Sequence, residues 1–156
     1  MCITCLFLIG SVVAAPLPEE TGLRIPNEPI DHVIQIEAMI KPWVFNITAI
    51  DGVPVNASKY TSASGVGYAD SVVYNTLELK VGLVYRLEYT AIDTEHGLLI
   101  NGLEDFWGDK IYATLPQHKT KVFFVKPTEE GTYRYRCSYL CGTGHQKMRG
   151  KVVVTA

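Results

Sequence analysis

Short segments in which apolar and polar residues alternate recur along most of the chain, and they constrain its fold more than any other feature. Alternation with a period of two is typical of a β-strand that buries one face. Such segments occupy 33–39, 43–50, 77–81, 85–89, 111–115, 120–125, 132–137 and 151–155. Glycine and proline residues separate many of them, and no window has the period of an amphipathic helix. The pattern predicts an all-β fold, a Greek-key sandwich or barrel of roughly eight antiparallel strands.

The length and composition of the chain fit one such domain. It has 156 residues, of which 47% are hydrophobic and 19% are charged, so it can form a packed core and is not expected to be disordered. Its formal net charge is −2, and Lys and Arg form no runs along the sequence. The sequence therefore argues against a nucleic-acid-binding surface and against a polybasic membrane patch.

The region before the first strand predicts export. Residues 3–15 form an apolar run that ends in small residues, which predicts a secretory signal peptide over residues 1–15. The run is too short for a membrane-spanning helix, and the alternatives are an uncleaved anchor or a buried strand. Residues 16–31 contain four of the eight prolines and predict an extended leader. Residues 32–156 then form the folded domain.

A signal peptide places the mature chain in a secreted, periplasmic or extracellular location. In a eukaryotic secretory pathway, the triplets that begin at Asn46 and Asn56 would be acceptors for N-glycans. Asn56 is the better candidate, because Asn46 lies in an apolar segment where a glycan fits poorly.

The residues capable of chemistry gather between the last two predicted strands. Two thiols, an imidazole and a thioether lie close together there, on Cys137, Cys141, His145 and Met148. Thiolate, thioether and imidazole ligands favour copper, whereas zinc binds Cys and His and rarely Met. The intervening glycines would let a crowded loop wind tightly around a small ion.

The spacing alone leaves several interpretations open. One cysteine with His145 and Met148 would suffice for a single copper ion, and two thiolates could bridge a pair of metals. Cys137 and Cys141 could instead form a local disulfide, which an oxidising compartment favours. Met148 alone would more often fill a core than bind a metal.

The run CSYLCGTGHQKMRGKVVV, with the spacing Cys-x-x-x-Cys-x-x-x-His-x-x-Met, resembles the dinuclear copper (CuA) motif. That motif occurs in cytochrome c oxidase subunit II, especially of the ba3 type, and in nitrous oxide reductase. The resemblance implies a cupredoxin-like fold over residues 33–155 and two copper ions bridged by the thiolates of Cys137 and Cys141.

The resemblance also implies the remaining ligands. His145 would bind one copper, Met148 would be a weaker ligand, and the backbone carbonyl of Tyr139 would take the place of the family's carbonyl ligand. The family's second histidine follows a strand and a short polar turn, and His96 in AIDTEHGLLINGL matches it. His32, in the leader, and His118, in a turn, are expected to be exposed surface residues.

The chain departs from the family in two respects. Subunit II of the oxidases carries membrane helices ahead of its copper domain, whereas this chain shows only a predicted signal peptide. Many oxidase subunits have an acidic residue where this chain has Tyr139. That acidic side chain helps to bind a metal at the catalytic subunit, and it is absent here. These differences indicate a free-standing domain and leave its docking to an oxidase open.

The implied function is one-electron transfer with a redox protein partner that the sequence does not identify. No Ser/His/Asp or paired-carboxylate pattern appears elsewhere, so no enzymatic turnover is expected from this chain alone. One alternative is a secreted copper-binding protein for copper storage, delivery or sensing. Another is an interaction module in which Cys137 and Cys141 form a disulfide. Aromatic residues at Trp43, Phe45, Tyr133 and Tyr135 are expected to pack the sandwich, and Trp43 could instead be an electron-entry group.

Overall fold

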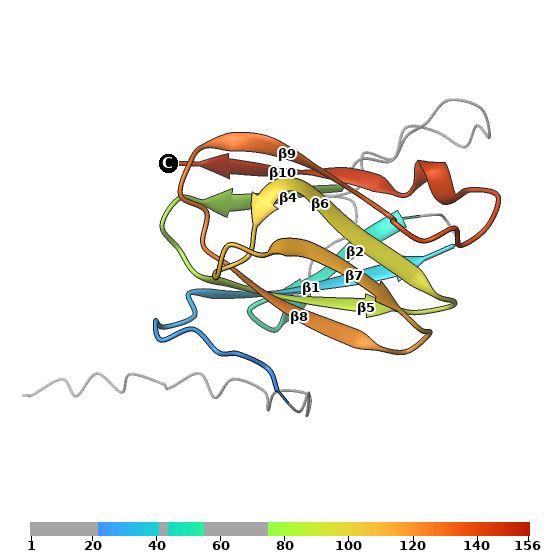
Figure 1. The fold of residues 1–156 in the computed structure, drawn as a ribbon, viewed down its shortest axis with the longest axis horizontal. Helices are drawn as coiled ribbons and strands as arrows, with labels where there is room; N and C mark the ends of the chain where they lie inside the picture. The colour runs from blue at the N-terminus through green and yellow to red at the C-terminus, as the bar shows by residue number, and fades with distance from the viewer. Residues whose placement is uncertain (1–21, 41–43, 55–74) are drawn as a thin grey trace, which may run out of the picture.

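The structure is a computed structural model that describes residues 22–40, 44–54 and 75–156 (Figure 1). Two five-stranded sheets pack face to face, and we call them sheet A and sheet B. The predicted signal peptide, the start of the leader, Trp43 and Asn56 lie outside the described residues. Residues 22–31 form no helix or strand and lead directly into the first strand of sheet A.

Sheet A has the strand order β3-β2-β1-β5-β8, and sheet B has the order β4-β10-β9-β6-β7. The strands of sheet A are β1 (His32–Met39), β2 (Val44–Ile50), β3 (Val53–Pro54), β5 (Tyr85–Ala91) and β8 (Thr120–Val125). The strands of sheet B are β4 (Asn75–Lys80), β6 (His96–Glu104), β7 (Lys110–Leu115), β9 (Gly131–Arg136) and β10 (Arg149–Thr155). A short 3-10 helix, η1 (His145–Lys147), lies between β9 and β10.

The all-β prediction is confirmed, and each predicted segment overlaps a strand. Two parts of the prediction are wrong. β1 pairs with β5 and β4 pairs with β10 in parallel, so neither sheet is purely antiparallel. Strands that are parallel neighbours cannot be joined by a tight hairpin, and both of these pairs join strands that are distant in the sequence.

β6 is the second departure, because no strand was predicted over these residues. Its buried apolar side chains are Leu98, Ile100 and Leu103, and the step from 100 to 103 breaks the period of two. The register shifts between Leu99 and Glu104, where Gly102 has a φ of 81°. A bulge that inserts an extra residue reverses the face that later side chains occupy, which hides the strand from a search for alternation.

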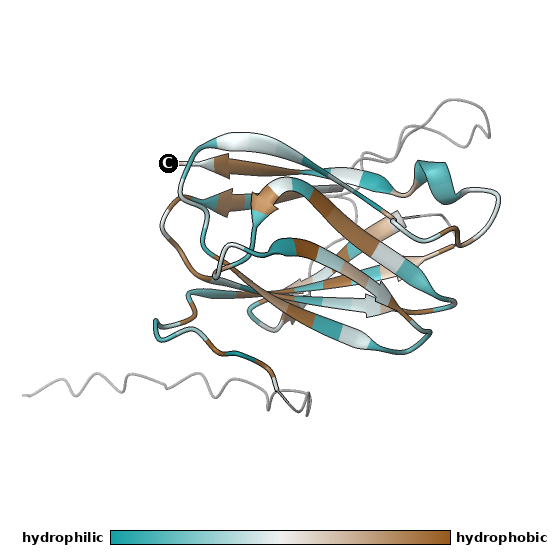
Figure 2. Ribbon diagram, in the orientation of Figure 1, coloured by the Kyte–Doolittle hydropathy of each residue, from teal (hydrophilic) through white to brown (hydrophobic). Residues whose placement is uncertain are grey.

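The core lies between the two sheets and consists of buried side chains from their strands. Figure 2 shows that strands of both sheets contain hydrophobic stretches, coloured brown. Phe45 of β2 meets Tyr135 of β9 edge to face, with 5.2 Å between ring centroids, so this pair links the two sheets. Tyr133 packs against the same core. The expected packing of these three aromatic residues is confirmed.

The strand directions in sheet B bring the ends of three strands together at one end of the sheet. β6 begins at this end of the sheet, β9 is antiparallel to β6 and ends there, and β10 is antiparallel to β9 and begins there. The residues at the start of β6 therefore lie beside the loop that joins β9 to β10. Among the described residues, no helix is long and apolar enough to cross a membrane.

Truncating a core side chain should show how far stability depends on this sandwich. Leu87 of β5 is fully buried, so Leu87→Ala should lower the free energy of unfolding by about 2–5 kcal/mol in urea titrations of the metal-free protein. Leu140, which is 79% exposed, provides the matched control, and Leu140→Ala should change stability by less than about 0.5 kcal/mol. Equal losses in the two variants would contradict this account of the core.

Candidate metal centre

The loop between β9 and β10 is closed by one backbone hydrogen bond. The N–H of Cys137 donates to the carbonyl of Met148 at 2.9 Å, which continues the pairing of the two strands past their ends. Within the loop, the N–H of His145 donates to the carbonyl of Gly142 at 3.1 Å, and η1 follows. Gly142 has a φ of 140°, a conformation that residues with a side chain rarely adopt. The loop is therefore folded back over the end of the sheet.

This folding gathers the sulfur atoms of the loop. The Sγ atoms of Cys137 and Cys141 are 3.7 Å apart, and the Sδ atom of Met148 lies 3.5 Å from the Sγ of Cys141. The Nδ1 atom of His145 is 3.8 Å from that same sulfur. The carbonyl oxygen of Tyr139 lies 3.1 Å from the Sγ of Cys137. Both cysteines are free thiols, because their separation far exceeds the roughly 2.05 Å of a disulfide bond.

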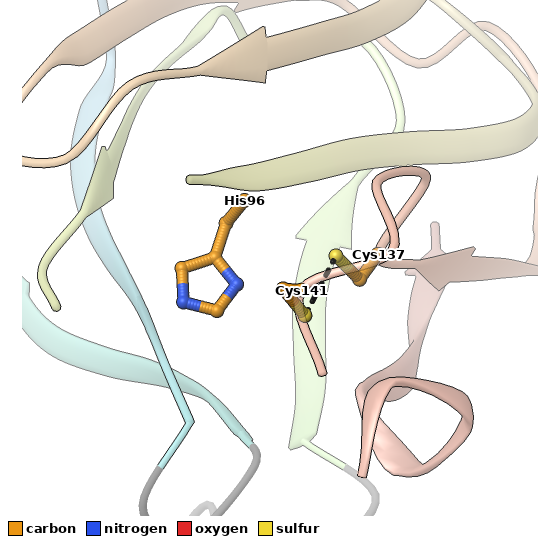
Figure 3. A group of neighbouring side chains, drawn as sticks. All are labelled: His96, Cys137 and Cys141. Atoms are coloured by element: carbon orange, nitrogen blue, oxygen red, sulfur yellow. Dashed lines mark hydrogen bonds between the residues drawn. The ribbon is translucent and has the colours of Figure 1, made fainter. Parts of the chain in front are cut away.

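His96 approaches the two thiols from the neighbouring strand, as Figure 3 shows. It is the first residue of β6 and is completely buried. One ring nitrogen of His96 and the sulfurs of Cys137 and Cys141 all lie within 4.8 Å of one another. Five donor-bearing side chains and one backbone carbonyl, all named from the sequence, therefore lie in one cluster.

The two ring nitrogens of His96 have different surroundings. Nε2 lies 2.9 Å from the Oδ1 of Asp93, whereas Nδ1 is buried with no hydrogen-bond partner. An unpaired buried nitrogen is costly, and a metal ion would satisfy it. A carboxylate on the opposite nitrogen fixes the tautomer that leaves Nδ1 free for a metal. The arrangement fits a metal bound by imidazole and sulfur.

Gly97 allows the loop to approach the strand closely. A Cβ atom at this position would lie 2.8 Å from the backbone nitrogen of Tyr139 and 2.9 Å from that of Ser138. The Gly97 N–H lies 3.4 Å from the Sγ of Cys137 and donates to it, and the Gly97 carbonyl accepts a hydrogen bond from the buried Tyr89 hydroxyl. Only glycine lets β6 and the cysteine loop meet at this distance.

The donor set selects the kind of metal. Two thiols, a thioether and two imidazoles are soft or borderline ligands, which suit copper and are unsuited to calcium or magnesium. No protein-family profile matches the chain.

Two oxidase subunits resemble the chain in sequence. It is 28% identical over 153 residues to cytochrome c oxidase subunit 2 of Thermus thermophilus, a match that covers 96% of this chain and 84% of that protein. It is also 30% identical over 93 residues to the alternative cytochrome c oxidase subunit 2 of Bradyrhizobium diazoefficiens. That second match covers 58% of this chain and only 31% of the relative, so the chain spans about a third of its length.

The fold agrees with the sequence matches. The periplasmic domain of subunit II of cytochrome oxidase from Bradyrhizobium japonicum superimposes with a TM-score of 0.56 at 20% identity. The superposition covers 82% of this chain and 86% of that domain. The chain therefore resembles cytochrome c oxidase subunit II in sequence and shares the fold of its periplasmic domain.

The electrostatics of the cluster separate its two thiols. Burial would raise the pKa of the Cys137 thiol, but the nearby imidazole of His96, the backbone at Gly97 and Tyr139, and His145 together lower it to about 6. Burial and the charge of Cys137 raise the pKa of Cys141 to about 12. Cys137 therefore ionises first, and its charge opposes the second ionisation until a cation arrives.

The aromatic and imidazole groups around the thiols respond to the same charges. Burial would lower the pKa of His96, but the neighbouring Cys137 thiol and the Asp93 carboxylate raise it. Burial, followed by the charges of the two thiols, raises the pKa of Tyr89 far above its usual range, so its hydroxyl remains protonated and can donate to Gly97. The site thus contains negative charge that a metal cation would compensate.

The sequence analysis missed two residues that shape this site. Asp93 lies three residues before His96, and this acidic residue was the available signal for its role. Gly97 follows His96 directly, but its close approach to Ser138 is visible only in the structure. Both residues act on the cluster from the β5–β6 turn and the start of β6.

The other two histidines of the described chain lie outside the cluster. His32 does not belong to the leader, because it is the first residue of β1, where it pairs with Asp51 at 2.8 Å. Its side chain is 41% exposed. His118 lies in the β7–β8 turn and is exposed, as expected. No contact links either residue to the thiols.

The separation of the two thiols should be visible in a pH titration of the metal-free protein. Thiolate absorbance near 240 nm, corrected with the Cys137→Ser/Cys141→Ser variant, should show one thiolate forming well below the ordinary value of about 8.5. The second thiolate should be absent even at a pH of about 10, because the first charge suppresses it. Two equal ionisations near pH 8.5 would contradict this arrangement.

The close approach at Gly97 should make this position intolerant of a methyl group. Gly97→Ala should lower the free energy of unfolding by about 1–3 kcal/mol, because the loop has to move away from β6. The amide resonances of Ser138 and Tyr139 should shift with it. Gly131→Ala is the control, because the atom nearest to its Cβ would be the hydroxyl oxygen of the Tyr133 side chain, at 3.3 Å. A stable, unshifted Gly97→Ala variant would refute the packing argument.

Proposed function

We propose that this domain binds two copper ions in a CuA centre and transfers single electrons. The proposal is carried mainly by the unpaired Nδ1 of His96, which faces two free thiols in a completely buried position. The thiolates of Cys137 and Cys141 would bridge the two ions, and His96 and His145 would each bind one of them. The Met148 sulfur and the Tyr139 carbonyl would complete the set.

Copper, when bound, would supply a redox couple that gains and loses one electron. The chain would contribute ligands that do not move between the two states. Cys137 and Met148 are fixed by the hydrogen bond between their backbones, and His96 is fixed by Asp93. Ligands held in this way limit the rearrangement that accompanies each electron transfer.

The position of the cluster favours transfer of electrons over catalysis. His96, Cys137 and Met148 are each 1% exposed or less, which leaves no access for a substrate from the strand side. Cys141 and His145 are partly exposed, so the centre comes nearest to solvent through the loop. An electron can cross this short distance, whereas a substrate molecule would need an open ligand position.

The relatives support an assignment of compartment and partner. The solved relative is described as a periplasmic domain of an oxidase subunit, and we assign the same side of the membrane to this domain. Its electron partners would be redox proteins in that compartment.

Metal stoichiometry and EPR, measured together on the copper-loaded protein, test the proposal. Two coppers per chain that share one unpaired electron would support it. One copper per chain, or copper that exchanges rapidly with a chelator, would favour storage or delivery instead. A sample without bound copper would show that the cluster is not a copper site.

The ligands should differ in their importance. Cys137→Ser or Cys141→Ser should abolish the shared-electron signal, because each thiolate is expected to bridge both ions. Met148→Leu should retain copper and shift the reduction potential, because a thioether is the weaker ligand. Met39→Leu is the matched control and should change neither property. A normal dinuclear spectrum in either cysteine variant would disprove the bridging assignment.

A further inference from the structure

Four cationic side chains gather on the outer surface of sheet B. They lie next to the loop that joins β9 to β10 (residues 137–148), which we call the metal loop. Arg134 and Arg136 lie on β9, Arg149 and Lys151 lie on β10, and all four are exposed. We call these four residues the basic face. In Figure 2 the η1 segment and nearby parts of β9 and β10 are coloured hydrophilic. The cluster contrasts with the net charge of −2 of the whole chain.

The strand register pairs like charges on this face. Arg136 lies opposite Arg149, and Arg134 lies opposite Lys151. Like charges in direct cross-strand pairs destabilise a sheet. In the part of the chain that the structure describes, none of the four forms an ion pair within 4.0 Å. The acidic residue of this face, Glu78 on β4, is in register with Val153 and not with a cation. Among the described residues, cross-strand pairing on the basic face therefore supplies no stabilising ion pair, although the Nε of Arg149 donates to the backbone carbonyl of Gln146 at 2.7 Å.

The basic face continues directly into the proposed copper ligands. Arg136 precedes Cys137 in the chain, and Arg149 follows Met148. The backbone hydrogen bond between Cys137 and Met148 extends the same β9–β10 ladder. A molecule that covers the basic face would therefore lie one residue away from two proposed ligands.

The composition of the face favours a protein as its occupant. Three of the four cations are arginines, which bind carboxylates in a bidentate manner. Arg149 pairs across the sheet with Arg136, which pairs with Leu99 of β6, which pairs in turn with Tyr112 of β7. Tyr112 is 55% exposed, so it extends this surface. Arginine and tyrosine are enriched in protein interfaces. Binding to anionic membranes typically uses larger lysine and arginine clusters next to a membrane segment.

We propose that the basic face is the docking surface for an acidic redox protein that exchanges electrons with the metal centre. This inference rests on the proposed function. In one exchange, a single electron leaves the reduced centre of one protein and enters the oxidised centre of the other. The first is oxidised and the second is reduced by one electron, and no bond or proton is transferred.

Charge reversal on this face tests the proposal with small oxidants of opposite charge. The reduced copper-loaded protein is mixed with hexacyanoferrate(III), an anion, or with tris(1,10-phenanthroline)cobalt(III), a cation. Arg134→Glu/Arg136→Glu should slow oxidation by the anion about tenfold and accelerate oxidation by the cation, because local charge steers encounter. Equal effects on both reagents, or no effect, would overturn the proposal.

Lys80→Glu/Lys110→Glu is the matched control. It changes the net charge by the same amount, and both lysines are exposed at the end of sheet B opposite the metal loop. This variant should change either rate less than about twofold at ordinary ionic strength, because screening limits the reach of its charges. An effect as large as that of the arginine variant would show that only net charge matters, against the proposal.

Binding to a polyanion separates this inference from the copper assignment. The metal-free protein is titrated with poly-L-glutamate and, in parallel, with vesicles of phosphatidylglycerol and phosphatidylcholine. Salt-sensitive shifts of amide resonances in β9 and β10 with the peptide, lost in the arginine variant, would support the proposal. Stronger capture by the vesicles would overturn it in favour of a membrane. A domain that fails to load two coppers but passes this test would refute only the proposed function.

The arginine variant should remain folded, because each substitution converts a like-charge pair into an opposite-charge pair. Its melting temperature should equal or exceed that of the parent. Should it fall, Arg134→Gln/Arg136→Gln supplies the same tests without the added acids. Unchanged rates and unchanged peptide binding in that second variant would overturn the proposal.

Discussion

The hydrogen bond from the Cys137 amide to the Met148 carbonyl is the contact on which the metal loop depends. It closes the loop at the point where β9 and β10 separate, so the ends of the loop have the spacing of paired strands. Within that limit, two thiols, an imidazole and a thioether must share a small volume. The rigidity of the site thus comes from the sheet, and the loop supplies only the donors.

Much of the fold and the cluster could be predicted because the signals are local. Alternation along a strand is a pattern formed by residues a few positions apart, and so is the Cys-x-x-x-Cys-x-x-x-His-x-x-Met spacing. His96 was found through the resemblance to a family, since nothing in its own neighbourhood distinguishes it from a core histidine. The ligand roles of all these residues remain predictions.

What could not be predicted depends on pairing between distant segments. The parallel pairs β1–β5 and β4–β10 leave no mark in either strand alone, and the bulge near Gly102 concealed β6 by breaking its alternation. The basic face was missed for the same reason. Its cations occupy alternate positions on two strands, so they form no run in the sequence and meet only through the register.

Asp93 joins two parts of the molecule that are usually considered separately. One carboxylate oxygen holds the ring of His96, and the other accepts the backbone N–H of Ile40 at 2.7 Å, just beyond the end of β1 in sheet A. The carboxylate cannot turn toward one partner without weakening its bond to the other. The rate at which the Ile40 amide exchanges with solvent therefore reports, from the opposite sheet, on the orientation of a histidine at the metal site.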